Sequence, residues 1–256
     1  MTAACSAARV AVCSGLAALA LVSTGTRALA QQSDRATWME RVSLSARYGV
    51  LRPSGGSDVF ALVDRALAPG SNALRPQLLG AELHVGVTPR WRVLLGAEAG
   101  QRTVGSHSRV QPVPSLGDVR QQTTLEITSL QYVGGAWQAL RWRGASTGAS
   151  DRLRLLVGAG AGTARYRFRQ WGEFVDADRQ VAYADDFRSA GRGGFGYVST
   201  ALEVPLRRWL AVQADVRRQF GSAPMTADYA SFDRLDLGGT RAGVGVSLRP
   251  VRGTVR

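Results

Sequence analysis

Glu82 and His84 stand two residues apart in a segment where apolar and polar residues alternate. A carboxylate beside an imidazole can act as the orienting group and the base of a general acid–base catalyst. Such a pair also needs a nucleophile, and the sequence places no serine beside it. A structural ion-pair network perturbs protonation in the same way and is the simpler interpretation. We therefore predict no catalytic residue, no cofactor and no metal site in this segment or elsewhere in the chain.

The charged residues of the other alternating segments follow the same rule, because they fall on the polar face of each segment. With Glu82 and His84 they form one set of predicted interior side chains: Arg47, Glu82, His84, Arg92, Glu98, Arg102, Glu126, Arg154, Glu203, Asp215, Arg217 and Arg241. The arginines and carboxylates of this set nearly cancel. We predict that they pair across a narrow interior, since an unpaired buried charge is costly.

The second histidine, His107, lies between two serines in a predicted loop. A histidine near the surface is a candidate base for hydrolysis of lipid. It keeps open the alternative hypothesis of a lipid-acting enzyme.

The elements that must position these residues are strands, because the alternation has a period of two. Eight such segments are predicted, at about residues 42–52, 78–88, 91–103, 123–138, 152–169, 194–205, 208–220 and 236–249. One face of each is apolar and almost uncharged, and the other carries the charges. A closed barrel with lipid outside and a polar interior gives each face the solvent it needs.

Two local features qualify this pattern. In the fourth segment the phase changes between Ile127 and Leu130, which predicts a β-bulge near Ser129. In the fifth segment Arg165, Arg167 and Arg169 continue the outward row, so the lipid-facing part is predicted to end near Thr163.

The connections between the predicted strands alternate in length. Short turns at 88–90 and 205–207 and a Gly/Ser/Thr segment at 144–150 alternate with long links at 53–77, 104–122, 170–193 and 221–235. This is the layout expected of short periplasmic turns and long extracellular loops. In the first long link, residues 57–67 have the apolar stripe of an amphipathic helix, which we expect over the barrel mouth.

Aromatic residues are distributed between the two predicted ends. At the short-turn end we predict a periplasmic aromatic girdle of Trp38, Trp91, Trp137, Trp142 and Trp209. The opposite rim is predicted to use Tyr166, Phe168, Phe195, Tyr197 and Phe220.

Residues 1–30 have the pattern of a cleaved signal peptide, with an apolar core and Ala28-Leu29-Ala30 as the cleavage site. Both cysteines lie within it, so the remaining part, 31–256, is predicted to be a single barrel domain without thiols. All 32 Lys and Arg residues are arginine, and the net charge is +13. They are spread over strands, turns and loops rather than grouped with aromatics, so we expect no nucleic-acid partner.

The signal peptide, eight alternating strands, alternating connections and charged interior resemble small outer-membrane barrels of the OmpA-like and OmpW-like type. This resemblance implies an all-β fold: an eight-stranded antiparallel up-and-down transmembrane β-barrel in the outer membrane of a diderm bacterium. Implied partners are outer-membrane lipid, lipopolysaccharide and the barrel-assembly machinery.

The expected role is non-enzymatic. A charge-plugged lumen would serve membrane integrity, surface interaction or limited passage of small molecules. Two alternatives remain open, a lipid A-modifying barrel enzyme and a soluble periplasmic barrel like the lipocalins. The second would place its apolar face inside.

Overall fold

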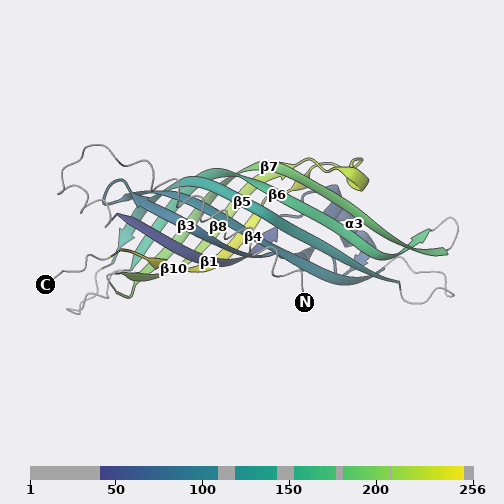
Figure 1. Cartoon of the computed structure of the whole chain (residues 1–256), viewed down its shortest axis with the longest axis horizontal. Helices are drawn as coiled ribbons and strands as arrows, with labels where there is room; N and C mark the ends of the chain where they lie inside the picture. Colours follow the sequence, from purple (N-terminus) through teal and green to yellow (C-terminus); the bar gives the residue numbers. More distant parts are fainter. Residues whose placement is uncertain (1–40, 109–118, 143–152, 177–180, 208, 251–256) are drawn as a thin grey trace.

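Eight long strands form one antiparallel sheet that closes on itself. The structure is a computed structural model that describes residues 41–108, 119–142, 153–176, 181–207 and 209–250 (Figure 1). The strands are β1 (Val42–Pro53), β3 (Gln77–Gly86), β4 (Trp91–Ser108), β5 (Arg120–Arg141), β6 (Arg154–Asp176), β7 (Val181–Pro205), β8 (Leu210–Ala223) and β10 (Gly239–Leu248). Each pairs with its neighbours along the chain, and β10 also pairs with β1. The predicted eight-stranded up-and-down barrel is confirmed.

One row of paired residues, followed round the barrel, shows how strongly the strands are tilted. The row leaves β1 at Arg52 and returns to β1 ten residues lower, after passing Thr240, Arg218, Val198, Ala159, Gly135, Val93, Val85 and finally Val42. With about 3.3 Å per residue and about 4.8 Å between strands, this stagger gives a tilt of about 40°. The interior of such a barrel is just wide enough for side chains to fill.

Four neighbouring strands are longer than the sequence predicted. β4, β5, β6 and β7 contain 18, 22, 23 and 25 residues, and Figure 1 shows them extending beyond the other strands at one end. The prediction of a long loop over 170–193 is therefore wrong, because β6 and β7 continue as a paired hairpin from Gly172 opposite Asp185 to Asp176 opposite Val181. In β6 just before this extension, the exposed outward residues are Arg165, Arg167 and Arg169.

The predicted bulge in the fourth long strand is confirmed. The pairing of β5 with β6 shifts register between Ile127 and Ser129. As a result Ile127 and Leu130 are both buried, although they stand three residues apart. A second shift lies between Glu98 and Gly100 in the pairing of β4 with β5.

The link between β1 and β3 contains the predicted helix, α3 (Asp58–Ala66). Its Val59, Phe60 and Val63 are buried against the barrel interior. The short strands β2 (Leu67–Ala68) and β9 (Leu235–Asp236) add pairings to β4 and β8 at the loop end. In the described ranges no helix has the length and apolar character needed to cross a membrane.

Candidate functional site

A cluster of buried ion pairs occupies the barrel interior. This central charge cluster consists of three arginines and three carboxylates: Arg47, Arg217, Arg241, Glu82, Glu98 and Asp215. Their side chains are at most 3 % exposed. The strands place them inside because each alternates with outward apolar residues, as Arg47 does between Ala46 and Tyr48.

Each arginine of the cluster contacts a carboxylate from a different strand. Arg47 bridges Glu82 and Asp215. Arg241 reaches Glu98 through Nε at 2.8 Å and Asp215 through Nη1 at 2.8 Å. The contacts join β1, β3, β4, β8 and β10, so the cluster ties opposite walls of the barrel together.

Two tyrosines complete the central charge cluster. Arg217 Cζ lies 4.1 Å and 4.3 Å from the ring centres of Tyr132 and Tyr197. The Tyr132 hydroxyl lies 2.7 Å from Glu82 Oε2 and 3.0 Å from Glu98 Oε1. Sequence reasoning missed both roles. The sequence did contain a signal for Tyr197, because it lies on the same face of its strand as the inward Glu203.

His84 is buried beside this cluster. Its Nε2 lies 2.9 Å from Glu82 Oε1 and 3.3 Å from Ser45 Oγ, and Ser45 Oγ lies 2.5 Å from Ser247 Oγ. The sequence did not reveal Ser45, which strand pairing places opposite Glu82. In a catalytic triad the serine and the carboxylate contact different ring nitrogens. In this barrel both contact Nε2, which fits a polar network rather than an activated serine.

A second cluster lies nearer the short turns. Glu203 Oε2 is 2.6 Å from Arg92 Nη1, and Glu203 Oε1 is 3.1 Å from Arg154 Nη1 and 2.6 Å from Arg249 Nη2. Arg92, Arg154 and Glu203 belong to the predicted interior set, whereas Arg249 was not predicted. One carboxylate therefore faces three guanidinium groups.

Two members of the predicted interior set do not join these clusters. Glu126 lies on the outer face, 22 % exposed, and pairs with Arg167 at 3.8 Å. The prediction is wrong because Leu125 and Ile127, before the bulge, take the inward positions. Arg102 lies just beyond Gln101, where the pairing of β4 with β3 ends, and its side chain is exposed.

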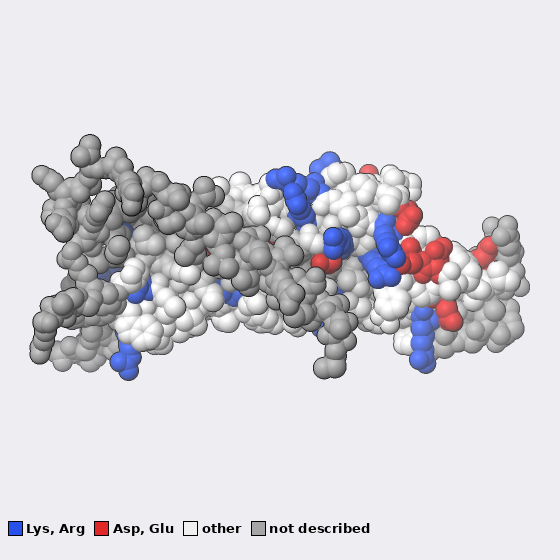
Figure 2. Space-filling model, viewed as in Figure 1, with Lys and Arg blue, Asp and Glu red and all other residues white. Residues whose placement is uncertain are grey.

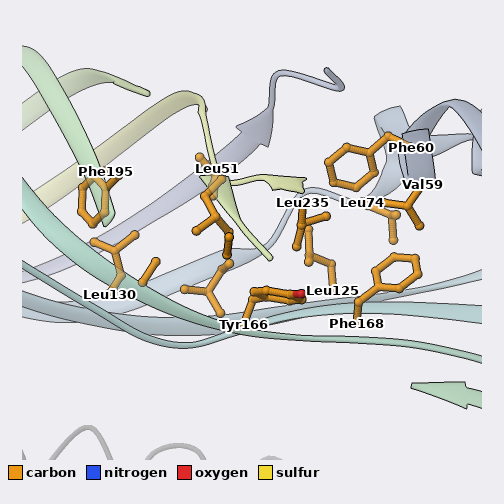
Figure 3. Packing of buried hydrophobic residues seen from close by; sticks show 14 of the residues in the cluster. Leu51, Val59, Phe60, Leu74, Leu125, Leu130, Tyr166, Phe168, Phe195 and Leu235 are labelled. Carbon is orange, nitrogen blue, oxygen red and sulfur yellow. The ribbon is translucent and has the colours of Figure 1, made fainter. Parts of the chain in front are cut away.

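Toward the loop end the interior becomes apolar. This outer apolar core includes Leu51, Val59, Phe60, Leu74, Leu125, Leu130, Tyr166, Phe168, Phe195 and Leu235 (Figure 3). Tyr166, Phe168, Phe195 and Tyr197 were predicted to form an outer aromatic rim, and that prediction is wrong. They alternate with outward arginines and glycines, so they face inward. Only Phe220 of the predicted rim points out, with 56 % of its surface exposed.

Two links fold into this core. Figure 3 shows Phe60 and Val59 of α3 pointing into the same interior region as Phe168 of β6. From the link between β8 and β10, Tyr229 packs edge-on against Phe168 at 5.3 Å between ring centres. Its hydroxyl donates to Gln170 Oε1 at 2.5 Å, and burial raises the pKa of that hydroxyl.

At each height along the barrel axis, the outer surface has the opposite polarity to the interior. An apolar band of exposed side chains surrounds the central charge cluster: Leu44, Tyr48, Leu79, Leu95, Val133, Val157, Val198, Val216, Val244 and Leu248. Below it, Trp91, Trp137, Trp142 and Trp209 are exposed at the short-turn end, and Trp91 lies directly opposite Trp137. Trp38 and residues 1–30 lie outside the described residues.

Arginines follow the apolar band toward the loop end. We call Arg52, Arg165, Arg167, Arg192 and Arg218 the outer basic girdle, because all are exposed on the outer face. In Figure 2 basic side chains gather beyond an uncharged stretch, and acidic ones lie further toward the same end. The apolar band is suited to contact with the hydrocarbon of a membrane, and the arginines that border it are suited to contact with polar headgroups.

Beyond the girdle, Asp186 joins two arginines across the β6–β7 hairpin. Arg169 donates to it through Nε and Nη2, both at 2.7 Å, and Arg188 through Nε at 3.0 Å. These hydrogen bonds hold the pKa of Asp186 below its usual range. Within the described ranges, no group of three or more His, Cys, Asp or Glu residues is placed to hold a metal ion.

A closed antiparallel barrel with an apolar exterior band and buried ion pairs inside is a transmembrane β-barrel of the outer-membrane type. The lipocalin-like alternative is wrong, because it requires an apolar interior at the level where this barrel carries its charges.

Solved structures are similar to this chain at low sequence identity. No protein-family model matches the sequence, and no curated protein is significantly similar to it. The outer membrane protein OprG from Pseudomonas aeruginosa is 11 % identical with a TM-score of 0.41, over 82 % of this chain and 96 % of that one. Neisserial surface protein A is 8 % identical with a TM-score of 0.39, over 82 % and 97 %. The N-terminal barrel of Pseudomonas aeruginosa OprF is 12 % identical with a TM-score of 0.33, over 81 % and 96 %. At these identities the likeness concerns the fold alone.

Proposed function

We propose that the protein is a non-enzymatic integral barrel of the outer membrane whose lumen is closed, and that it serves membrane integrity and surface interaction. This proposal rests on one observation: two different groups of side chains fill the narrow barrel interior, one above the other. The central charge cluster fills the level of the apolar band, and the outer apolar core fills the level above it.

The central charge cluster and the outer apolar core oppose the passage of solutes for different physical reasons. Opening the central charge cluster would separate buried ion pairs, and each charge left without its partner is costly. Opening the outer apolar core would expose Phe60, Phe168 and their neighbours to water, at about 25 cal/mol for each Å² of apolar surface. A solute or ion would have to overcome both barriers in series.

Conductance across a planar lipid bilayer tests this proposal. The wild-type barrel should give no discrete conductance steps. Because the barriers lie in series, Arg217→Ala alone and Phe60→Ala alone should also stay silent, whereas the double variant should conduct. Discrete channels formed by the wild type would overturn the closed lumen. Heat-modifiable gel mobility would establish that each variant is folded.

The alternative of a lipid A-modifying enzyme concerns His107, which is exposed in β4 opposite Ala68. We propose that it has no catalytic role. Mass spectrometry of lipid A from host membranes should give the same species with wild type and with His107→Ala. A lipid A species that requires His107 would support the enzyme instead.

The proposed partners follow from the location. Acyl chains would contact the apolar band, and lipopolysaccharide headgroups would lie at the level of the outer basic girdle. Insertion would use the barrel-assembly machinery, as for other barrels of the outer membrane.

A further inference from the structure

A polar cleft with a volume of about 390 Å³ lies on the outer face, where the link between β1 and β3 meets β1, β8 and β10. Three of its lining residues stand side by side in one row of paired strands: Arg52 of β1, Thr240 of β10 and Arg218 of β8. The link contributes Ser71, Asn72 and Asp64. The volume lies within the range of small-molecule sites, about 300–1,000 Å³.

The cleft lies at the upper margin of the apolar band. The next outward row below Arg52, Thr240 and Arg218 consists of Val50, Ala242 and Val216. A molecule in the cleft can therefore place a polar head among the arginines while its apolar part lies against the band.

The two arginines of the cleft carry charge that no carboxylate of the described residues neutralises by an ion pair. Arg52 Nη2 donates to Asn72 Oδ1 at 3.3 Å, and Arg218 Nη1 donates to Thr240 Oγ1 at 3.0 Å. Among the described residues neither arginine forms an ion pair with a carboxylate, and each guanidinium keeps unused N–H donors.

One carboxylate, that of Asp64, lines the cleft, and its negative charge would repel a bound anion. Asp64 Oδ1 accepts the Ser71 N–H at 2.7 Å, and Asp64 Oδ2 accepts the Ser71 hydroxyl at 2.8 Å. These hydrogen bonds direct both of its oxygens to Ser71. Two arginines and one aspartate leave the lining with a net positive charge.

We propose that this cleft binds a phosphate group on the sugar headgroup of an outer-leaflet glycolipid. Guanidinium groups pair with phosphate through parallel, charge-assisted hydrogen bonds. The neutral hydroxyl and amide groups of Ser71, Asn72 and Thr240 suit a sugar, and the adjoining row of Val50, Ala242 and Val216 suits acyl chains. The site rests on the proposed placement of the barrel in the outer membrane.

Native mass spectrometry of the full-length, detergent-solubilised barrel tests the site, with bis-phosphorylated and dephosphorylated lipid A as probes. The wild type should retain the phosphorylated form at least about tenfold better, because charge-assisted hydrogen bonds to phosphate are strong. The variant Arg52→Gln/Arg218→Gln should lose this preference.

The matched control is Arg165→Gln/Arg192→Gln. These arginines also belong to the outer basic girdle and lie directly opposite each other on β6 and β7, but they do not line the cleft. The control should lose much less of the preference than the cleft variant. Equal losses in both variants would mean diffuse attraction by the girdle and would overturn the cleft.

Two further arms distinguish the source of the phosphate. Phosphatidylglycerol retained as well as phosphorylated lipid A, or complete displacement of lipid A by millimolar inorganic phosphate, would overturn the glycolipid assignment. Heat-modifiable mobility shows whether a variant has folded. A negative result for this site would not contradict the proposal of a closed lumen, because conductance tests that proposal separately.

Discussion

The guanidinium of Arg217 packs on the ring of Tyr132, with Cζ 4.1 Å from the ring centre. Its neighbour in the chain, Arg218, lies on the other side of the same strand, exposed and 5.7 Å from the ring centre of Phe220. Two consecutive arginines thus have opposite surroundings, and they allow a direct comparison of a buried with an exposed charge.

Arg217→Ala should lower the free energy of unfolding by about 3–5 kcal/mol, because it leaves Glu82 with one fewer buried partner. Arg218→Ala should change it by less than about 1 kcal/mol, as for exposed polar side chains. Urea unfolding of the barrel in lipid vesicles, followed by tryptophan fluorescence, measures both. Similar losses for the two variants would show that the central charge cluster contributes little.

Val133→Arg tests the apolar band. Val133 is 51 % exposed on the outer face of β5, four residues from Trp137. An arginine near the bilayer midplane should cost about 2–4 kcal/mol of barrel stability. Gln122→Arg, on the same outer face of β5 but at the loop end, should be nearly neutral. Equal costs in vesicle unfolding experiments would contradict the assigned membrane level.

Phe60→Ala tests the outer apolar core. Phe60 is fully buried, and removal of its ring should cost about 3–5 kcal/mol locally. We expect faster amide hydrogen exchange in the link between β1 and β3, with β8 and β10 unchanged. Arg65→Ala, on the exposed side of α3, is the control and should leave exchange as it is. Faster exchange throughout the barrel would mean that the two levels unfold together.

The hairpin formed by β6 and β7 should depend on pH through Asp186. Because its folded-state pKa is lowered, the stabilisation is present above the usual carboxyl pKa of about 4 and is lost as pH falls through the lowered value. The hairpin should therefore keep its exchange protection from pH 7 down to about pH 4 and lose it only in stronger acid.

Carboxyl NMR measures the titration midpoint of Asp186 directly. Arg169→Gln or Arg188→Gln should raise that midpoint toward the usual range, because each removes hydrogen bonds to the carboxylate. An unchanged midpoint in both variants would show that these hydrogen bonds do not lower the pKa of Asp186.

The parts of the fold that could be predicted from sequence are those where one face meets lipid. In β1 from Val42 to Val50, in β3 from Leu79 to Val85 and in β10 from Arg241 to Leu248, the outward residues are apolar and the inward ones polar or small, so alternation alone assigns both faces. Arg47, Glu82 and Arg241 were placed correctly for this reason. The register that brings them into contact could not be predicted, because strand stagger depends on all eight strands together.

The loop end was harder to predict because the two faces of the strands exchange their character there: apolar residues face inward and charged ones outward. In β6, Tyr166 and Phe168 face inward and Arg165 and Arg167 face outward, whereas lower in the same strand Val157 faces out. A rule that equates apolar with outward therefore fails beyond Thr163. The bulge was visible as a change of phase, but the phase alone did not say which side of it faced the interior, and Glu126 was misplaced.

This reversal of polarity along one cylinder has a mechanical consequence. Movement of the barrel outward along the membrane normal would expose valines to water, and movement inward would draw the arginines into hydrocarbon. Both displacements raise the energy steeply, so the depth of the protein is fixed from both sides. Where the bilayer thickness differs from that of the band, the lipid rather than the protein should adjust.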